Sequence, residues 1–239
     1  MIAHIFCLLL TVITGTWSMQ TADGQAQFET RWSSPDGHHN NDSSHTVSLA
    51  DLGFANNQTP NGHVTFKQHR DAGDFVFDGW LNNGDGGGTY TFTQNAAFFN
   101  ELKRRGYDVN DEEGKMMTAA TLDITMAYVN SIEALGYRGD FNHLVTFRAL
   151  NITSQYVSEM KNAGIGDLSE NEIVSLKALK VDQKYVSELA SVGFSHLSAR
   201  DLVTMKALKI DSAYIKYLAG HGFRNLTVHQ VVEMKAERI

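Results

Sequence analysis

The chain is almost without cysteine. Cys7 is the single cysteine among 239 residues, and it lies in an N-terminal segment that we expect to be removed. A mature chain without cysteine has no disulfide, no thiol nucleophile and no zinc site ligated by cysteine. An exported protein of this kind must be held together by its hydrophobic core, and a chain of roughly 210 residues is long enough to form one.

The sequence also has no excess of basic residues. The net charge is −7, and residues 27–117 carry 7 Lys and Arg against 13 Asp and Glu. Residues 118–239 are neutral, with 13 residues of each sign. Binding to DNA or RNA relies on basic side chains that neutralise phosphates, so we expect no nucleic-acid partner.

The longest apolar run is short and lies at the N-terminus. MIAH is followed by IFCLLLTVITGTW and then by a polar stretch with small residues at Gly24 and Ala26. This layout predicts a signal peptide over residues 1–26, with cleavage near Ala26, and export to the periplasm or the extracellular space. A membrane anchor is the alternative, although it needs about 20 apolar residues and Gly15, Thr16 and Ser18 interrupt the run.

Residues 27–95 have the alternating pattern of β-strands. Clear examples are HVTFKQHR, DFVFDGWL and TYTFT, which are rich in aromatic and β-branched residues. Alternation of this kind is typical of antiparallel strands with one buried face. We therefore predict a small antiparallel β domain over 27–95, with a hairpin at the glycine-rich segment NNGDGGG.

A 29-residue sequence then recurs three times. Repeat 1 (149–177) is ALNITSQYVSEMKNAGIGDLSENEIVSLK, repeat 2 (178–206) is ALKVDQKYVSELASVGFSHLSARDLVTMK, and repeat 3 (207–235) is ALKIDSAYIKYLAGHGFRNLTVHQVVEMK. Self-similarity at a fixed period indicates units that stack on one another. Each repeat has room for two helices of about ten residues, the second starting at a Ser or Thr capping box.

The repeat continues upstream in weaker form. Residues 121–148 match it with one residue missing, and residues 96–120 form a degenerate first unit. The helical region 96–239 is thus expected to contain about five helical hairpins: 96–120, 121–148, 149–177, 178–206 and 207–239. The predicted fold class is α+β, in which a small antiparallel sheet precedes an α-solenoid.

Four residues are candidates for facing a ligand. Lys177, Lys206 and Lys235 occur once per repeat, and Trp80 lies on the aromatic sheet. The lysines have a structural interpretation as well, because a cation in the last turn of a helix is favoured by the helix dipole. The recurrent tyrosines Tyr156, Tyr185 and Tyr214 are expected in the core with their hydroxyls at its rim.

No motif in the chain specifies a reaction. The zinc-protease pattern His-Glu-x-x-His, the Gly-x-Ser-x-Gly elbow and the Walker loop are all missing, so no catalytic residue and no cofactor are predicted. The first half is rich in histidine and aspartate, but their spacing is irregular, and solvated surface residues are the favoured interpretation. These residues are His38, His39, His45, His63 and His69, with Asp36, Asp42 and Asp71.

The repeat phrase, with its Tyr, Gly-Phe and Asp-Leu-Val-x-Met-Lys-Ala-Leu elements, resembles helical repeats in a family of bacterial regulators. The segment RDAGDFVFDGWLNNGDGGGTYTFTQNAAFFNELKRRGY resembles the region that precedes such repeats there. This family is that of the beta-lactam-sensor membrane metallopeptidases, and the similarity is to their C-terminal periplasmic parts over residues 62–239. The protease motif and membrane helices of the family are not in this chain, so the resemblance implies no protease activity.

These observations favour a non-catalytic interaction or sensor-like module of the bacterial cell envelope. Its partner would be a protein or a cell-wall-derived ligand, and the resemblance implies possible association with membrane regulatory proteins. The alternative is a hydrolase with a carboxylate site on the acidic β domain, where Asp71, Asp74, Asp78 and Asp85 are the candidates.

Overall fold

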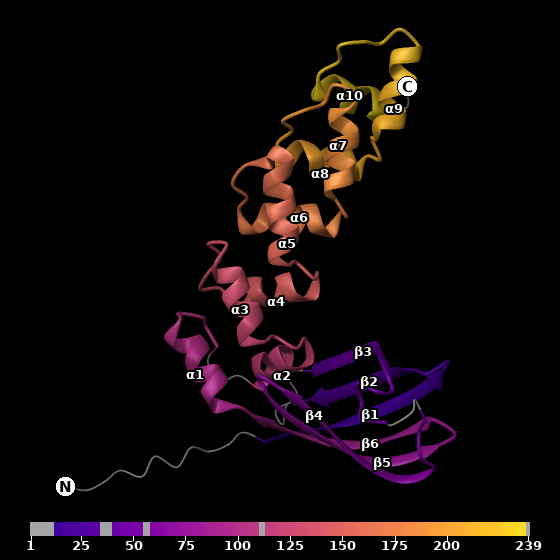
Figure 1. Cartoon of the computed structure of the whole chain (residues 1–239), viewed down its shortest axis with the longest axis vertical. Helices are drawn as coiled ribbons and strands as arrows, with labels where there is room; N and C mark the ends of the chain where they lie inside the picture. The colour runs from indigo at the N-terminus through magenta and orange to yellow at the C-terminus, as the bar shows by residue number, and fades with distance from the viewer. Residues whose placement is uncertain (1–11, 34–39, 55–57, 110–112, 238–239) are drawn as a thin grey trace, which may run out of the picture. The chain divides into compact units, whose positions relative to one another are not determined.

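The computed structural model describes residues 12–33, 40–54, 58–109 and 113–237. Within them, six β-strands are followed by ten α-helices, which confirms the predicted α+β class (Figure 1). The chain divides into an N-terminal unit (1–129 with 138–141) and a C-terminal unit (130–137 with 142–239), which are described separately below. Among the described residues, no helix has both the length and the apolar character needed to span a membrane.

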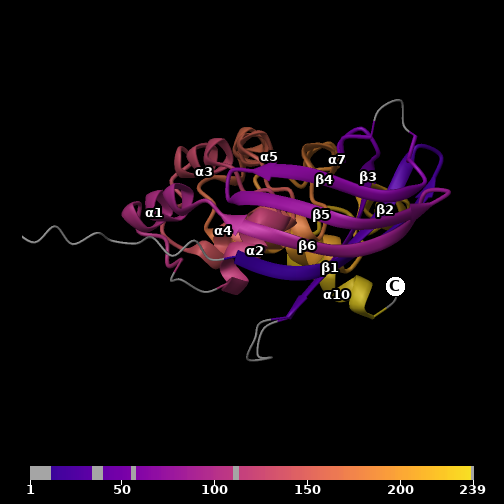
Figure 2. The ribbon, with the colours of Figure 1, turned by 90° about the horizontal axis from the view of Figure 1, so that it is seen from below.

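The six strands form one antiparallel sheet (Figure 2). Its order is β3-β2-β1-β6-β5-β4, so two three-strand meanders meet where β1 pairs with β6. The strands are β1 (Val12–Ala22), β2 (Gln25–Ser33), β3 (Asn40–Ser48), β4 (Gly62–Arg70), β5 (Gly73–Asn82) and β6 (Asp85–Gln94).

Two tight turns connect strands within these meanders. Asn82 pairs with Asp85 across the turn Asn83-Gly84, where both residues have positive φ, 50° and 90°. Asp23-Gly24 joins β1 to β2 in the same way, with φ of 52° and 73°. Asn-Gly and Asp-Gly are the dipeptides that two-residue hairpins of this type favour. The predicted hairpin over NNGDGGG is confirmed, and the three glycines after the turn belong to β6.

Aromatic side chains fill the buried face of the sheet. The rings of Phe66 and Phe77 stack at 4.8 Å, and the ring of Trp17 meets Phe66 edge-on at 5.2 Å. Phe54, in the segment after β3, lies 5.3 Å from Phe66 and covers part of this face. Edge-to-face and offset contacts of this kind each stabilise a core by about 0.5–1.5 kcal/mol beyond the burial of area.

The sheet begins earlier than residue 27. Strand β1 lies within the segment predicted as a signal peptide, and it pairs with β2 on one side and β6 on the other. Ile13, Trp17 and Met19 point into the core, with exposures of 3%, 3% and 1%. Thr16 and Ser18 alternate with these side chains, so the segment has the pattern of a half-buried strand as well as the apolar character typical of a signal peptide. Residues 1–11, including Cys7, lie outside the described residues.

The helices follow the sheet in sequence. In the first stretch they are α1 (Ala96–Arg104), α2 (Glu113–Thr121), α3 (Met126–Glu133) and α4 (Phe141–Ala149). Repeat 1 contains α5 (Ser154–Met160), the π-helical turn η2 (Lys161–Ile165) and α6 (Glu170–Ala178). Repeat 2 contains α7 (Gln183–Ala190) and α8 (Ala199–Ala207), and repeat 3 contains α9 (Ser212–Gly220) and α10 (Val228–Ala236).

The predicted helix ends are confirmed in all three repeats. Ser169, Ser198 and Thr227 each cap the second helix of a repeat with a complete capping box. In each repeat the conserved spacing also places a glycine after the first helix, as at Gly193, whose φ of 96° suits a residue without a side chain. The second helices α6, α8 and α10 contact one another in sequence, which brings consecutive repeats together.

Strand β1 provides a test of the N-terminal boundary. We expect a chain that starts at Gln27 to lose its cooperative thermal transition in near-ultraviolet circular dichroism, because β2 and β6 would lose their shared neighbour. A chain that starts at Val12 is the matched control and should unfold like the full chain, since it keeps all six strands. Equal melting temperatures for the two truncated chains would contradict a structural role for β1.

Candidate functional site

Each repeat holds a lysine over a tyrosine ring. The Nζ atoms of Lys177, Lys206 and Lys235 lie 4.3, 4.0 and 4.0 Å from the ring centroids of Tyr156, Tyr185 and Tyr214. The lysines sit in the last turns of α6, α8 and α10 and are half-buried. An ammonium over an aromatic face gains roughly 0.5–1 kcal/mol at such a site. The candidate ligand-facing lysines therefore also have a structural contact within their own repeats.

The tyrosines connect each repeat to the next one. The Tyr156 hydroxyl donates to the Val181 carbonyl at 2.8 Å, and the Tyr185 hydroxyl donates to the Ile210 carbonyl at 2.6 Å. Both acceptors belong to the following repeat, immediately before its first helix. Burial raises the pKa of Tyr185 to about 12, and the nearby Asp211 carboxylate adds to this rise. The neutral hydroxyl is thus the form that these contacts favour.

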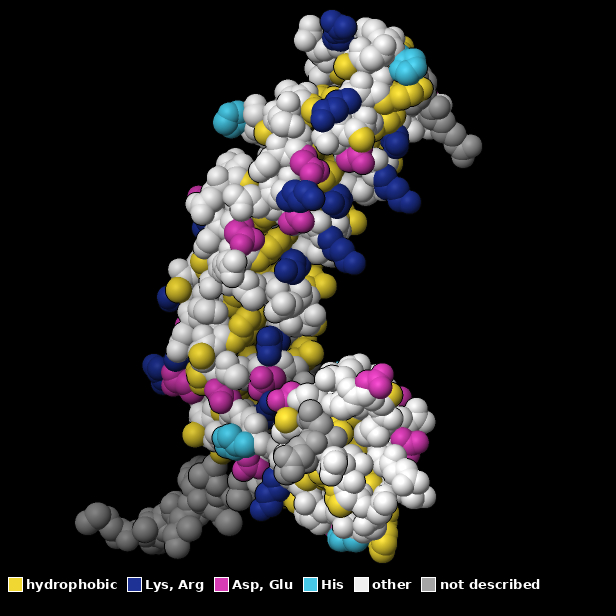
Figure 3. All heavy atoms as spheres, turned by 45° about the vertical axis from the view of Figure 1, so that its right-hand side comes forward, with side chains coloured by type: hydrophobic (Ala, Val, Ile, Leu, Met, Phe, Trp, Pro, Cys, Tyr) yellow, Lys and Arg dark blue, Asp and Glu magenta, His cyan; other side chains and the backbone are white. Residues whose placement is uncertain are grey.

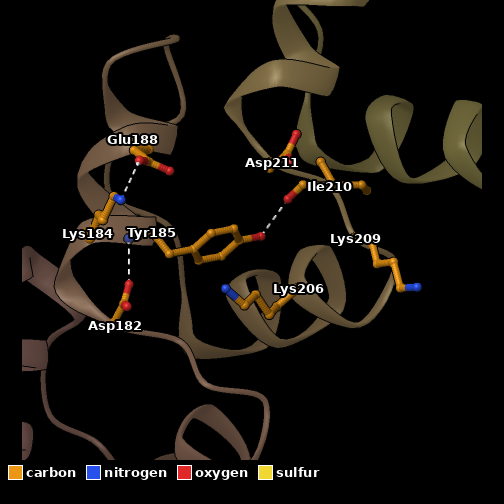
Figure 4. Close-up of a pocket in the computed structure, with 8 residues that line it drawn as sticks. All are labelled: Asp182, Lys184, Tyr185, Glu188, Lys206, Lys209, Ile210 and Asp211. Carbon is orange, nitrogen blue, oxygen red and sulfur yellow. Dashed lines mark hydrogen bonds and ion pairs between the residues drawn. The ribbon is translucent and has the colours of Figure 1, made fainter.

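A cavity of about 420 Å³ opens beside the pair in repeat 2 (Figure 4). Its lining consists of Asp182, Lys184, Tyr185, Glu188, Lys206, Lys209, Ile210 and Asp211. Lys206 reaches toward the Tyr185 ring while Lys209 points away from it, and Lys184 forms an ion pair with Glu188 at 3.8 Å. Asp182 and Asp211 are engaged in capping α7 and α9. The cavity therefore offers both signs of charge to a polar group entering it.

Charged side chains of both signs follow the repeats. Figure 3 shows Lys and Arg side chains gathered along one side of the helical unit, with Asp and Glu side chains among them. This mixed surface suits a polar or zwitterionic partner better than a polyanion.

Repeat 3 differs from the other two at its surface. Ile165 and Phe194 are 9% exposed, whereas Phe223 at the equivalent position is 43% exposed. Repeats 1 and 2 carry Glu159 and Glu188 at a position where repeat 3 carries Tyr217. The Tyr217 side chain is 53% exposed, with its ring stacked 6.4 Å from Tyr214 and 4.2 Å from the His221 ring. We call Tyr214, Tyr217, His221 and Phe223 the aromatic end face.

The aromatic end face was missed from the sequence. The sequence does contain one indication of it, because Tyr217 in repeat 3 stands at the position that Glu188 occupies in repeat 2. Alignment of the three repeats makes this change visible, but the exposure of Phe223 follows only from the packing of the repeats.

Among the described residues of the N-terminal unit, Trp80 is the most exposed large aromatic side chain, at 66%. Its ring meets the ring of His63 edge-on at 5.5 Å, on the polar face of strands β4 and β5. Asp78 lies beside them and accepts hydrogen bonds from Thr65 at 3.0 Å and from His63 at 3.1 Å. These hydrogen bonds lower the pKa of the Asp78 carboxyl, with the Thr65 bond contributing most.

The four acidic residues of the alternative hydrolase site have separate partners. Asp71 accepts from the Met126 backbone amide, Asp74 pairs with His69, and Asp85 accepts from the Thr21 backbone amide. Asp74 and Asp78 lie four residues apart on β5, which is about 13 Å along a strand. This separation exceeds the roughly 5–9.5 Å between the carboxyl groups of glycoside hydrolases. No observation on these residues favours the hydrolase.

The histidines of the first half also have individual contacts. His45 lies against the Phe28 ring, and burial lowers its pKa, while His63 and His69 pair with different aspartates. His38, His39 and Asp36 lie outside the described residues. Over the ranges that the structure describes, no group of three or more His, Cys, Asp and Glu side chains is placed to hold a metal ion.

Comparisons of the chain with protein-family models, with curated proteins and with solved structures found no match.

Tyr185→Phe tests the bond between repeats 2 and 3. We expect the variant to lose about 1 kcal/mol of unfolding free energy at pH 8, because the Ile210 carbonyl loses its donor. The pKa of Tyr185 is raised, so this stabilisation is complete below pH 10 and is lost as the pH rises from 10 to about 12. Urea unfolding at pH 8 and pH 11 should show the difference between wild type and variant shrinking at the higher pH.

Tyr217→Phe is the control for this measurement. The Tyr217 ring is exposed, so its hydroxyl should contribute less than about 0.5 kcal/mol. An equal loss of stability in both variants would contradict the assignment of the effect to the Tyr185 hydrogen bond.

Proposed function

We propose that this protein is an exported, non-catalytic interaction module of the bacterial cell envelope. Its helical region would form an α-solenoid of about five hairpins, with a protein partner bound at the aromatic end face. The solenoid is supported by the recurring capping boxes, the sequential contacts of α6, α8 and α10, and the tyrosine hydrogen bonds between repeats.

The observation that carries the proposal is the aromatic end face. Where repeats 1 and 2 have glutamates, repeat 3 has Tyr217, and Phe223 of the same repeat is 43% exposed. Tyrosine and other aromatic residues are enriched among the residues that dominate binding energy at protein interfaces, while glutamate is depleted there. A change in this direction is expected of a docking surface and not of a solvated one.

The internal repeats indicate which partner fits this face. In repeats 1 and 2 the tyrosine equivalent to Tyr214 contacts the start of the next helical hairpin, where Val181 and Ile210 are buried at 1% and 0% exposure. That hairpin also supplies the carbonyl that accepts the tyrosine hydrogen bond. We therefore propose that the partner is a protein that packs apolar side chains against this face.

The envelope location rests on the N-terminal apolar run and on the resemblance to the periplasmic parts of sensor metallopeptidases. Since β1 begins at Val12, processing that preserves the sheet would have to occur before this residue and not near Ala26. Association with membrane regulatory proteins would follow from the same resemblance.

Site-specific photo-crosslinking tests the docking proposal. A photoreactive phenylalanine analogue at position 217 should capture a discrete partner in envelope extracts, whereas the same group at position 188 should not. The captured protein is then purified, and its affinity is measured by calorimetry. We expect Tyr217→Glu, which restores the residue of the other repeats, to weaken binding at least tenfold, with Trp80→Ala unchanged as the matched control.

Two outcomes would overturn the proposal. One is a purified partner that binds wild type and Tyr217→Glu equally well. The other is a concentration-dependent dimer in sedimentation velocity that Tyr217→Glu abolishes, since the face would then bind a second copy of this chain.

A further inference from the structure

The sheet exposes one tryptophan on its polar face. Trp17 and Trp32 are buried at 3% and 4%, whereas Trp80 is 66% exposed. Its neighbours along β5 on the same face are Asp78 and Asn82, both exposed polar residues. The aromatic core of the sheet lies on the opposite face, so the Trp80 ring takes no part in it.

On strand β6, the position paired with Trp80 is a glycine. Trp80 pairs with His63 on β4 and with Gly87 on β6, and Gly87 in turn pairs with Ser18 on β1. A Cβ atom at Gly87 would lie 2.6 Å from the Trp17 carbonyl oxygen, so a side chain is not accommodated there. Across these strands, the Trp80 side chain therefore projects from the sheet beside a position, Gly87, that has no side chain.

A polar pocket lies next to Gly87, on the side away from Trp80. It has a volume of about 210 Å³, and its lining includes Ser18, Gln20, Gln27, Glu29, Asp85 and Gly86. Gly86 directly precedes Gly87, and Ser18 is the cross-strand partner of Gly87. Two strand spacings separate Trp80 from Ser18, which is about 10 Å and close to the length of a disaccharide.

The pocket is lined by amide, hydroxyl and carboxylate groups. Asp85 uses Oδ1 to accept the Thr21 backbone amide, and a carboxylate has about four acceptor positions in total. Gln20 adds an amide that both donates and accepts, and Ser18 adds a hydroxyl that lies 3.5 Å from Glu29, while the Gln27 amide is already bonded to the Ser44 and Thr46 hydroxyls. Such a set matches neighbouring hydroxyls on a ring, each of which also donates and accepts.

We propose that this face of the sheet binds an oligosaccharide. One pyranose ring stacks its apolar C–H face on Trp80, where the negative face of the indole attracts the weakly positive C–H groups. The ring next to it lies over Gly87 and places its hydroxyls against Ser18, Gln20 and Asp85. This site lies on the N-terminal unit and is independent of the protein-docking proposal for the aromatic end face.

The charges and the strand pairing favour a sugar over other ligands. Asp78 and Asp85 place carboxylates near Trp80 and Gly87, which opposes nucleic acids, anionic lipids and other polyanions there, while Glu29 is paired with Arg31 at 3.7 Å. Trp80 lies on β5, which is hydrogen-bonded on both sides, so a peptide cannot add to it as an extra strand.

Tryptophan fluorescence offers a direct test. The full chain is titrated with chitohexaose, cellohexaose and maltohexaose, and binding is confirmed by calorimetry. We expect a saturable change in emission with at least one of the three, because Trp80 is the tryptophan in contact with solvent. Trp80→Ala should weaken this binding at least tenfold, Trp80→Phe should restore part of it, and Asp85→Ala should weaken it about fivefold.

Tyr217→Ala is the control, since it removes an exposed aromatic residue of the other unit and should leave sugar binding unchanged. The proposal is overturned if none of the three oligosaccharides binds saturably, or if binding survives Trp80→Ala. Each of these results leaves the partner crosslinked at position 217 unaffected, so the two proposals fail separately.

Discussion

The helical repeats are stabilised by stacking, and repeats 1 and 2 each donate a tyrosine hydrogen bond to the repeat that follows. A single hairpin of two short helices cannot bury its own apolar side chains, so its stability comes from its neighbour. The Tyr156 and Tyr185 hydroxyls reach the carbonyls of Val181 and Ile210, and a lysine amine lies over each ring. One tyrosine thus contacts the lysine of its own repeat and the backbone of the next repeat, and in repeat 2 it also lines the cavity.

The local features of this fold could be predicted from the sequence. Capping boxes, glycines after helices and the Asn-Gly hairpin depend on a few adjacent residues, and they appear where the pattern placed them. Strand β1 could not be identified in this way. Ile13, Trp17 and Met19 alternate with small polar residues, but an apolar stretch beside an N-terminus is also typical of a signal peptide. In the structure this segment pairs with β6, about 70 residues later, and a local pattern cannot show a pairing of that sequence separation.

In the candidate sites too, the residues could be recognised from the sequence, but their contacts could not. Recurrence identified Lys177, Lys206 and Lys235, yet their position over tyrosine rings depends on how the two helices of a repeat pack. Trp80 was recognisable as an aromatic residue on a strand. Its pairing with Gly87 and the polar pocket nearby depend on strand order. Surfaces made by residues distant in sequence need the register of the sheet, which the sequence pattern does not supply.

The central place of β1 also determines when the sheet can form during synthesis. β1, β2 and β3 are complete within the first 48 residues, but the partner that closes the middle of the sheet ends only at Gln94. Until β6 has left the ribosome, the free edge of strand β1 and the aromatic face of strands β1 to β3 remain exposed to solvent. Contacts of such long sequence separation form slowly and leave intermediates prone to aggregation. The nascent chain therefore passes through an interval in which a chaperone can act on it, before the helical repeats are made.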